Sequence, residues 1–247
     1  MTSPWIEFRP ERPNARARVV CVPYAGGSAQ VYHALARRIP EQVEFGAVQL
    51  PGRWNRWRDP LLTKVSDASR SLAAELTRVS QKPYALFGYS VGGLIAFETA
   101  RIVARHTTQQ QPQALIVAAS RAPAAKPKPP FLHRLPDDEF VRQHADRYPG
   151  GVPQAVLDNP DMLRMVLPVL KADTEMFETY QYVPGEPLQC PLYTIAGEQD
   201  LLHPPSSMAD WQKETTGMFF AETVAGGHFF INTAVDRIRA TILRALD

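Results

Sequence analysis

The sequence lacks the features that mark several protein classes. Only two of its 247 residues are cysteines, Cys21 and Cys190, and neither lies in a CxxC pair, which excludes a disulfide scaffold. No uninterrupted apolar run approaches the roughly 20 residues that span a bilayer. The first 15 residues contain no apolar core of a secretory signal. We therefore expect a cytoplasmic protein that does not associate with a membrane.

The balance of charge excludes a second set of functions. Twenty-seven lysines and arginines against 25 aspartates and glutamates give a formal net charge of +2, too small for a dominant field toward nucleic acid. The sequence contains no HExxH, no paired CxxC and no GxGxxG, so we expect neither a metal ion nor a bound cofactor. Because 45% of the residues are hydrophobic, the chain can bury enough surface to fold.

Short apolar runs alternate with longer stretches of helical periodicity. This alternation predicts an α/β fold, a mostly parallel sheet covered by helices on both faces. The expected strands lie at residues 18–23, 43–50, 83–88, 115–119, 191–196 and 218–224, and the expected helices at 31–39, 65–80, 91–105 and 233–246.

The alternation stops between about residues 123 and 187. Prolines are 23 of the 247 residues, about 9% against an average near 5%, and several stand in the run PAAKPKPP at 123–130. Helical patterns begin after Pro136 and at residues 159–160, and Pro168 either kinks the second helix or starts another. We predict one domain over residues 1–247, in which a helical insertion forms a lid over the functional site.

The pentapeptide GYSVG at residues 88–92 matches the G-x-S-x-G pattern of a nucleophile elbow. A predicted strand precedes it and a predicted helix follows it, which is the context that the elbow requires. Such a turn holds the serine hydroxyl at the carboxyl edge of the sheet and at a helix N-terminus, where the dipole favours an oxyanion. Ser90 is therefore the candidate nucleophile.

A serine nucleophile needs a base, and the base needs a carboxylate that orients it. His228 follows the last strand and precedes the last helix, where the chain order Ser, Asp, His of an α/β-hydrolase puts the base. His203 also follows a strand, but it is three residues from the best carboxylate. The other histidines lie far from the carboxyl end of any strand: His33, His106, His133 and His144.

The acid is found by elimination. No Asp or Glu occurs from Thr99 to Pro136, so the strand at 115–119 carries no carboxylate at its end. The strand at 191–196 is followed by the sequence GEQD, in which Asp200 is the preferred acid and Glu198 the alternative.

Two backbone N–H groups are expected to form an oxyanion hole. One belongs to Val91, the residue after the nucleophile, and the other to a loop after an early strand. The segment YAGGS at residues 24–28 follows such a strand, and its glycines let the backbone approach an oxyanion, so Ala25 is the candidate second donor.

Several segments together resemble the type II thioesterases, the editing enzymes of polyketide and nonribosomal peptide assembly lines. The matching segments extend over almost the whole chain: VPYAGGS at 22–28, VQLPGR at 48–53, ALFGYS at 85–90, SRAP at 120–123, LPDDE at 135–139, LPVLKAD at 167–173, ETY at 178–180 and GGHFF at 226–230. The family pattern implies the same roles for Ser90, Asp200 and His228. The sequence departs from it at Tyr89 and Val91, where the family usually has His and Met.

The resemblance implies a hydrolase that removes stalled or aberrant acyl groups from the phosphopantetheine arm of a carrier protein. The residues alone leave alternatives open. A Ser–His–Asp set also serves carboxylesterases and lipases, acyltransferases and cyclases use the same scaffold, and a hydrolase fold can serve as a non-catalytic binding protein.

Two basic segments are candidate docking surfaces, because carrier proteins are typically acidic. The first holds Arg121, Lys126, Lys128 and Arg134 with no acidic residue among them. The second is the run RWNRWR at 53–58, whose alternation of basic and aromatic residues is too short to indicate a single-stranded nucleic acid site.

Overall fold

Seven strands form one sheet with the order β1-β3-β2-β4-β5-β6-β7. The computed structural model describes all residues except 1–2, 9, 80–81, 107–109 and 128. Strand β1 is antiparallel to β3, and the other five pairings are parallel. The strands are β1 (Ile6–Phe8), β2 (Ala17–Val22), β3 (Val43–Val48), β4 (Tyr84–Tyr89), β5 (Ala114–Ala118), β6 (Leu192–Gly197) and β7 (Phe219–Val224).

Helices cover both faces of the sheet because successive strand residues point to opposite sides. Val20 and Val22 of β2 pack in one core with α2 (Val65–Val79) and α3 (Val91–Ala104). Val19 and Cys21 pack in the other core with α1 and α8. Helix α1 (His33–Ala36) extends the short η1 (Ala29–Tyr32), and α8 (Val235–Arg244) ends the fold. The predicted fold class is confirmed.

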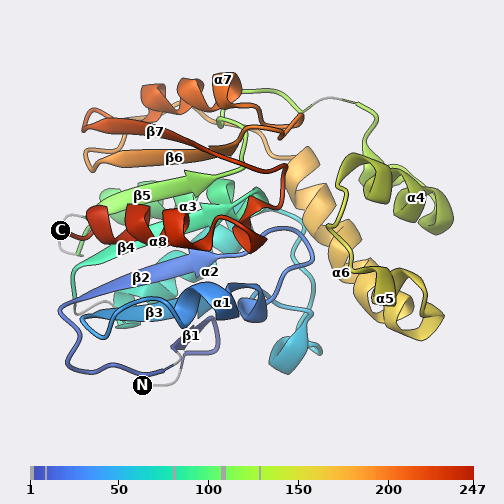
Figure 1. Ribbon diagram of the computed structural model, residues 1–247, viewed down its shortest axis with the longest axis horizontal. Coiled ribbons are helices and arrows are strands. Elements are labelled where there is room, and N and C mark those ends of the chain that lie inside the picture. The colour runs from blue at the N-terminus through green and yellow to red at the C-terminus, as the bar shows by residue number, and fades with distance from the viewer. Residues whose placement is uncertain (1–2, 9, 80–81, 107–109, 128) are drawn as a thin grey trace.

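The segment between β5 and β6 leaves the sheet, as the change of pattern predicts. It holds η3 (Leu132–Arg134), α4 (Asp137–Arg147), α5 (Gln154–Leu157) and α6 (Pro160–Glu178). Figure 1 shows these helices beyond the carboxyl ends of the parallel strands, which is the edge where Ser90 is expected. Helix α6 continues through Pro168, so this proline does not start a new helix.

The remaining elements are short. They are η2 (Trp54–Arg56), α7 (Pro205–Met208), η4 (Ala209–Glu214) and η5 (Phe230–Asn232). Among the described residues, no helix is both long and apolar enough to cross a membrane.

Candidate active site

Ser90 stands in a strained turn between β4 and α3. Its φ of 55° and ψ of −122° lie in a region that L-residues rarely adopt. Its backbone N–H donates to the Ala118 carbonyl at 2.9 Å, which ties the turn to the neighbouring strand β5. The turn thus lifts the hydroxyl from the end of β4 onto the N-terminus of a 14-residue helix.

Two glycines make this turn sterically possible. A Cβ atom on Gly88 would come within 2.2 Å of the Gly92 carbonyl oxygen, and one on Gly92 within 2.3 Å of the Val22 carbonyl oxygen. Both contacts are with backbone atoms, which cannot turn away as a side chain can. The G-x-S-x-G spacing therefore reflects the close passage of α3 over β4 and β2.

The structure brings Ser90, His228 and Asp200 together in a hydrogen-bonded chain. Nε2 of His228 lies 3.3 Å from Oγ of Ser90, and its Nδ1 lies 2.9 Å from Oδ2 of Asp200. The three residues are 6%, 7% and 2% exposed respectively. Each comes from a segment at the carboxyl edge of the sheet, after β4, β7 and β6.

Asp200 is held as an ionised hydrogen-bond acceptor. Its Oδ1 accepts from the backbone N–H groups of Leu202 at 3.0 Å and His203 at 3.1 Å. Burial would raise the pKa of Asp200, but the hydrogen bond and charge of His228 and the His203 N–H lower it below its usual value. Glu198, the alternative acid, is exposed to solvent.

Tyr89, one of the departures from the family pattern, supports the histidine loop. Its hydroxyl donates to the His228 carbonyl at 2.6 Å and accepts from the Ile231 N–H at 3.3 Å. The ring is fully buried under the sheet edge and does not line the cavity beside Ser90. The substitution at position 89 therefore acts on the loop that carries His228.

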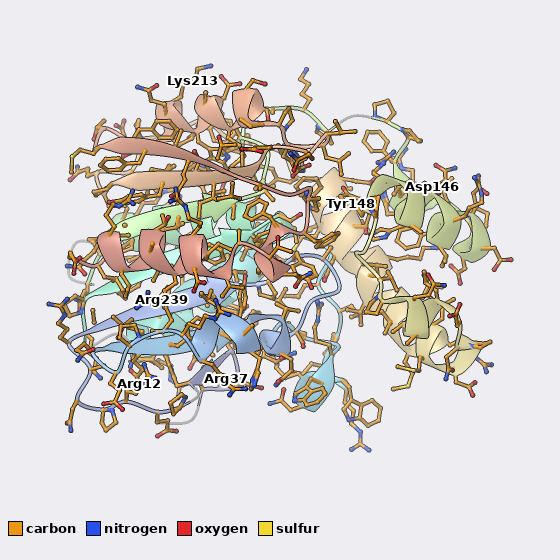
Figure 2. The ribbon with its side chains drawn as sticks, in the orientation of Figure 1. Arg12, Arg37, Asp146, Tyr148, Lys213 and Arg239 are labelled. Carbon is orange, nitrogen blue, oxygen red and sulfur yellow. The ribbon has the colours of Figure 1, made fainter. Side chains whose placement is uncertain are left out.

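A narrow cavity adjoins Ser90, with about 20 Å³ open to a water-sized molecule. The core contributes the expected Ala25, Val91 and His228, and the insertion closes the other side. Figure 2 shows Tyr148, just after α4, where the insertion meets the core. Sequence reasoning did not identify the other lining residues, which are Tyr24, His144, Tyr148, Thr174, Phe177 and Phe229.

His144 corrects one sequence prediction. It was expected far from the site, because α4 follows no strand. The insertion instead folds α4 over the sheet edge, and His144 is buried against Phe140 and Tyr148 with its Nδ1 unpartnered. Only the length of the interruption in the α/β pattern could have indicated that residues from this segment reach Ser90.

Of the basic residues expected to dock a carrier protein, Arg121 is not at the surface. It is 6% exposed, and its guanidinium donates to the carbonyls of Ala125 and Phe177. Lys126 and Arg134 are exposed and line one surface hollow with about 1130 Å³ of empty space. Lys128 lies outside the described residues.

The charges of the second basic segment are also less exposed than its sequence indicates. Arg53 is buried and ion-paired with Asp173 of α6. Arg56 pairs with Asp59 at 2.7 Å and covers the ring of Trp5. Arg58 is exposed beside Trp57, so only one of the three arginines presents its charge outward.

Two histidines near His228 stay neutral in the folded protein. Burial lowers the pKa of His144 to about 4, and the charges of Arg147 and His228 add to this effect. Burial likewise lowers the pKa of His203 to about 3, with a further contribution from His228. In an unfolded chain both would titrate near 6.5.

We expect the free energy of unfolding to fall as the pH drops from about 6.5 to 4. In that range the unfolded chain binds protons at His144 and His203 that the folded chain does not, so stability is fully present above 6.5 and is lost toward 4. The contribution of His144 is roughly 3 kcal/mol. Urea unfolding at several pH values measures the slope. In His144→Phe, which keeps a ring between Phe140 and Tyr148, the slope becomes shallower, and an unchanged slope would contradict the assignment.

The described residues contain no group of three or more His, Cys, Asp or Glu side chains arranged to hold a metal ion.

Comparisons with known proteins agree on one family. The family model of the thioesterase domain matches residues 17–246 of this chain. Thioesterase PikA5 of Streptomyces venezuelae is 36% identical over 230 residues, which cover 92% of this chain and 80% of that protein.

Solved structures give the same result in three dimensions. The RedJ thioesterase of the prodiginine pathway in Streptomyces coelicolor superposes with a TM-score of 0.87 at 32% identity, covering 96% of this chain and 92% of that one. The type II thioesterase BorB of the borrelidin cluster superposes with a TM-score of 0.88 at 32% identity, covering 100% and 97%. The chain therefore belongs to the thioesterase family and is a type II thioesterase with the α/β-hydrolase fold.

Proposed function

We propose that this thioesterase hydrolyses acyl groups from the phosphopantetheine arm of carrier proteins, with Ser90, His228 and Asp200 as nucleophile, base and orienting acid. The observation that carries the proposal is the buried hydrogen-bonded chain from Ser90 Oγ through His228 to Asp200. Two relatives support the substrate class, because RedJ is a thioesterase of the prodiginine biosynthetic pathway and BorB is a type II thioesterase of the borrelidin biosynthetic cluster.

The reaction follows in two steps. Ser90 Oγ attacks the thioester carbonyl while His228 Nε2 takes its proton, and the tetrahedral oxyanion is stabilised by the Ala25 and Val91 N–H groups. Collapse breaks the carbon–sulfur bond, and His228 returns the proton to the leaving thiolate. Water then attacks the acyl-enzyme with His228 as base, which releases the acid and restores Ser90. Asp200 holds the imidazole tautomer and stabilises its charged form throughout.

The insertion acts as a lid in this proposal. Residues of α4 and α6 close the cavity over Ser90, so the acyl chain meets His144, Thr174 and Phe177. This cover limits the access of bulk water to the reacting carbonyl and strengthens the electrostatic contacts there.

The substrate class is tested with three substrates that carry one acyl group. We expect hydrolysis of the acyl-carrier protein to exceed that of acyl-pantetheine, and both to exceed that of a simple ester, with intact mass spectrometry following the carrier. Equal or faster cleavage of the simple ester would instead favour the carboxylesterase alternative. Products of acyl transfer to an amine or hydroxyl would identify a transferase or cyclase.

Carrier docking is proposed at Lys126 and Arg134, the exposed members of the first basic segment. Reversing both charges, Lys126→Glu with Arg134→Glu, is expected to raise KM for the acyl-carrier protein roughly tenfold at low salt, because long-range attraction to an acidic partner is lost. KM for acyl-pantetheine, which carries no protein, stays unchanged. The matched control reverses Lys213 and Arg37, which Figure 2 shows on the core away from α4. An equal rise of this KM in the control would show that Lys126 and Arg134 do not form the docking surface.

A further inference from the structure

The loop that carries Ala25 is a tight turn. The Gly27 N–H donates to the Tyr24 carbonyl at 2.9 Å, and Gly26 between them has a φ of 74°. A hydrogen bond from the fourth residue to the first, with a glycine at positive φ in the third place, is the pattern of a type II β-turn. Ala25 therefore occupies the second place of this turn, and the orientation of its N–H depends on how the adjoining peptide planes are held.

One ion pair holds those peptide planes from outside the loop. Oδ2 of Asp173 accepts the Gly26 N–H at 2.7 Å and Nη1 of Arg53 at 2.5 Å, while Oδ1 accepts Arg53 Nη2 at 2.8 Å. The same Nη1 also donates to the Gly27 carbonyl at 3.1 Å. The pair thus holds the peptide between Ala25 and Gly26 by its N–H and the peptide between Gly27 and Ser28 by its C=O.

Packing also holds the ion pair and the turn in place. Asp173 is 0% exposed and lies on α6, and Leu170, one turn earlier, fills the space that a side chain on Gly26 would need, 2.9 Å from the ideal Cβ position. Arg53 is held in turn through its Nε, which donates to the Pro51 carbonyl at 3.2 Å. Neither charged side chain lines the cavity beside Ser90.

We propose that Asp173 and Arg53 are positioning residues for the oxyanion hole, fixing the turn at 24–27 so that the Ala25 N–H faces the carbonyl attacked by Ser90. This inference rests on the proposed hydrolysis and on Ala25 as a donor. Because Asp173 belongs to α6, the helix that lines the acyl cavity through Thr174 and Phe177 also sets the geometry of the hole.

The chain offers a matched control for this pair. Arg18 and Glu44 form a second buried ion pair, with Arg18 Nε 3.0 Å from Glu44 Oε2, near the amino ends of β2 and β3 and thus at the opposite edge of the sheet. Asp173→Asn and Glu44→Gln each remove one buried negative charge and leave an arginine unpaired, so both lower Tm. Only Asp173→Asn is expected to lower kcat, by roughly 10- to 100-fold. This fall is no larger than the one expected when an oxyanion-hole donor is removed altogether. KM for acyl-pantetheine stays near its wild-type value.

A double variant separates stability from positioning. Arg53→Met with Asp173→Leu replaces the ion pair by apolar groups, which restores stability in many buried pairs but leaves the Gly26 N–H without its acceptor. We expect Tm to recover toward wild type while kcat stays low. Recovery of kcat together with Tm would overturn the inference, since it would show that the pair acts only through stability.

A boronic acid inhibitor distinguishes failure of this inference from failure of the proposed function. An alkyl boronic acid forms a tetrahedral anion on Ser90 and reports on the oxyanion hole without any thioester. Its inhibition constant, read by protection from fluorophosphonate labelling, is expected to rise in Asp173→Asn by about the factor lost in kcat. If wild type leaves carrier thioesters intact yet the boronate weakens, the inference stands and the proposed substrate is wrong. If wild type hydrolyses them and Asp173→Asn retains both kcat and boronate affinity, the inference is wrong and the proposed function stands.

Discussion

Replacing Ser90 by alanine is expected to lower kcat for acyl-carrier hydrolysis roughly 10⁴- to 10⁶-fold, because the hydroxyl that His228 activates and that carries the acyl group is removed. Nε2 of His228 then faces a methyl group where it now lies 3.3 Å from Oγ. Substrate binding survives the change, so KM shifts little. A fluorophosphonate probe labels the wild type and leaves Ser90→Ala unlabelled.

The control for this experiment is Ser120→Ala. Ser120 is also buried, at the end of the neighbouring strand β5, and its Oγ has no hydrogen-bond partner. We expect this variant to retain labelling and turnover. An unlabelled wild type, or labelling that persists without Ser90, would show that the serine of the elbow is not the nucleophile.

The second large effect is expected for Asp200→Asn, a loss of about 10⁴-fold in kcat at pH 7. The side-chain oxygen of asparagine can still accept the N–H groups of Leu202 and His203, so the loop keeps its shape. Its NH₂ group then faces Nδ1 of His228 and donates to it. The imidazole proton moves to Nε2, which can no longer accept the proton of Ser90.

Glu198→Gln is the control for the acid. Glu198 lies two residues before Asp200 after the same strand, but it is exposed and makes no contact with His228. We expect full activity in Glu198→Gln, with kcat measured on the same acyl-carrier substrate and Tm measured for both variants. A comparable loss in both variants would assign the effect to the loop as a whole.

The sheet could be predicted from sequence because its central strands are fully buried. Strands buried on both faces read as continuous apolar runs, and β2 to β6, which are buried along their whole length, lie within one or two residues of their expected positions. Strand β7 lies within one residue of its expected position although it is only partly buried. Strand β1 was missed because it has three residues and pairs only at the edge. Helix α5 was missed for a similar reason, since a four-residue helix has too few turns to show a period.

The meeting of Ser90, Asp200 and His228 follows from chain order, since parallel strands put their carboxyl ends at one edge. The contact between Arg53 and Asp173 does not follow from it. These two residues are 120 positions apart, and one lies in the insertion, whose path over the sheet no local pattern encodes. Both stand in segments that match the family, but the sequence shows no sign that they pair.

For Arg121 the sequence prediction of an exposed docking residue was wrong. The stretch without acidic residues predicts a positive surface that a partner can reach. This prediction assumes that every basic side chain in the stretch is exposed to solvent. Arg121 lies three residues after the end of β5 and is covered by Phe177 of α6, and backbone carbonyls replace the water that its guanidinium would otherwise bind. The same folding of the insertion brought His144 to the cavity.

The backbone angle of Ser90 bears on how this sequence changes over generations. Its positive φ is easier for glycine, so Ser90→Gly is expected to relieve strain of about 1 kcal/mol while abolishing the nucleophile. Selection for stability alone therefore favours glycine over the nucleophile at this position once hydrolysis ceases to be useful. In a duplicated gene without that use, glycine at position 90 would be retained for its stability alone. A serine at this position in a diverged copy is therefore the outcome expected where selection for catalysis continues.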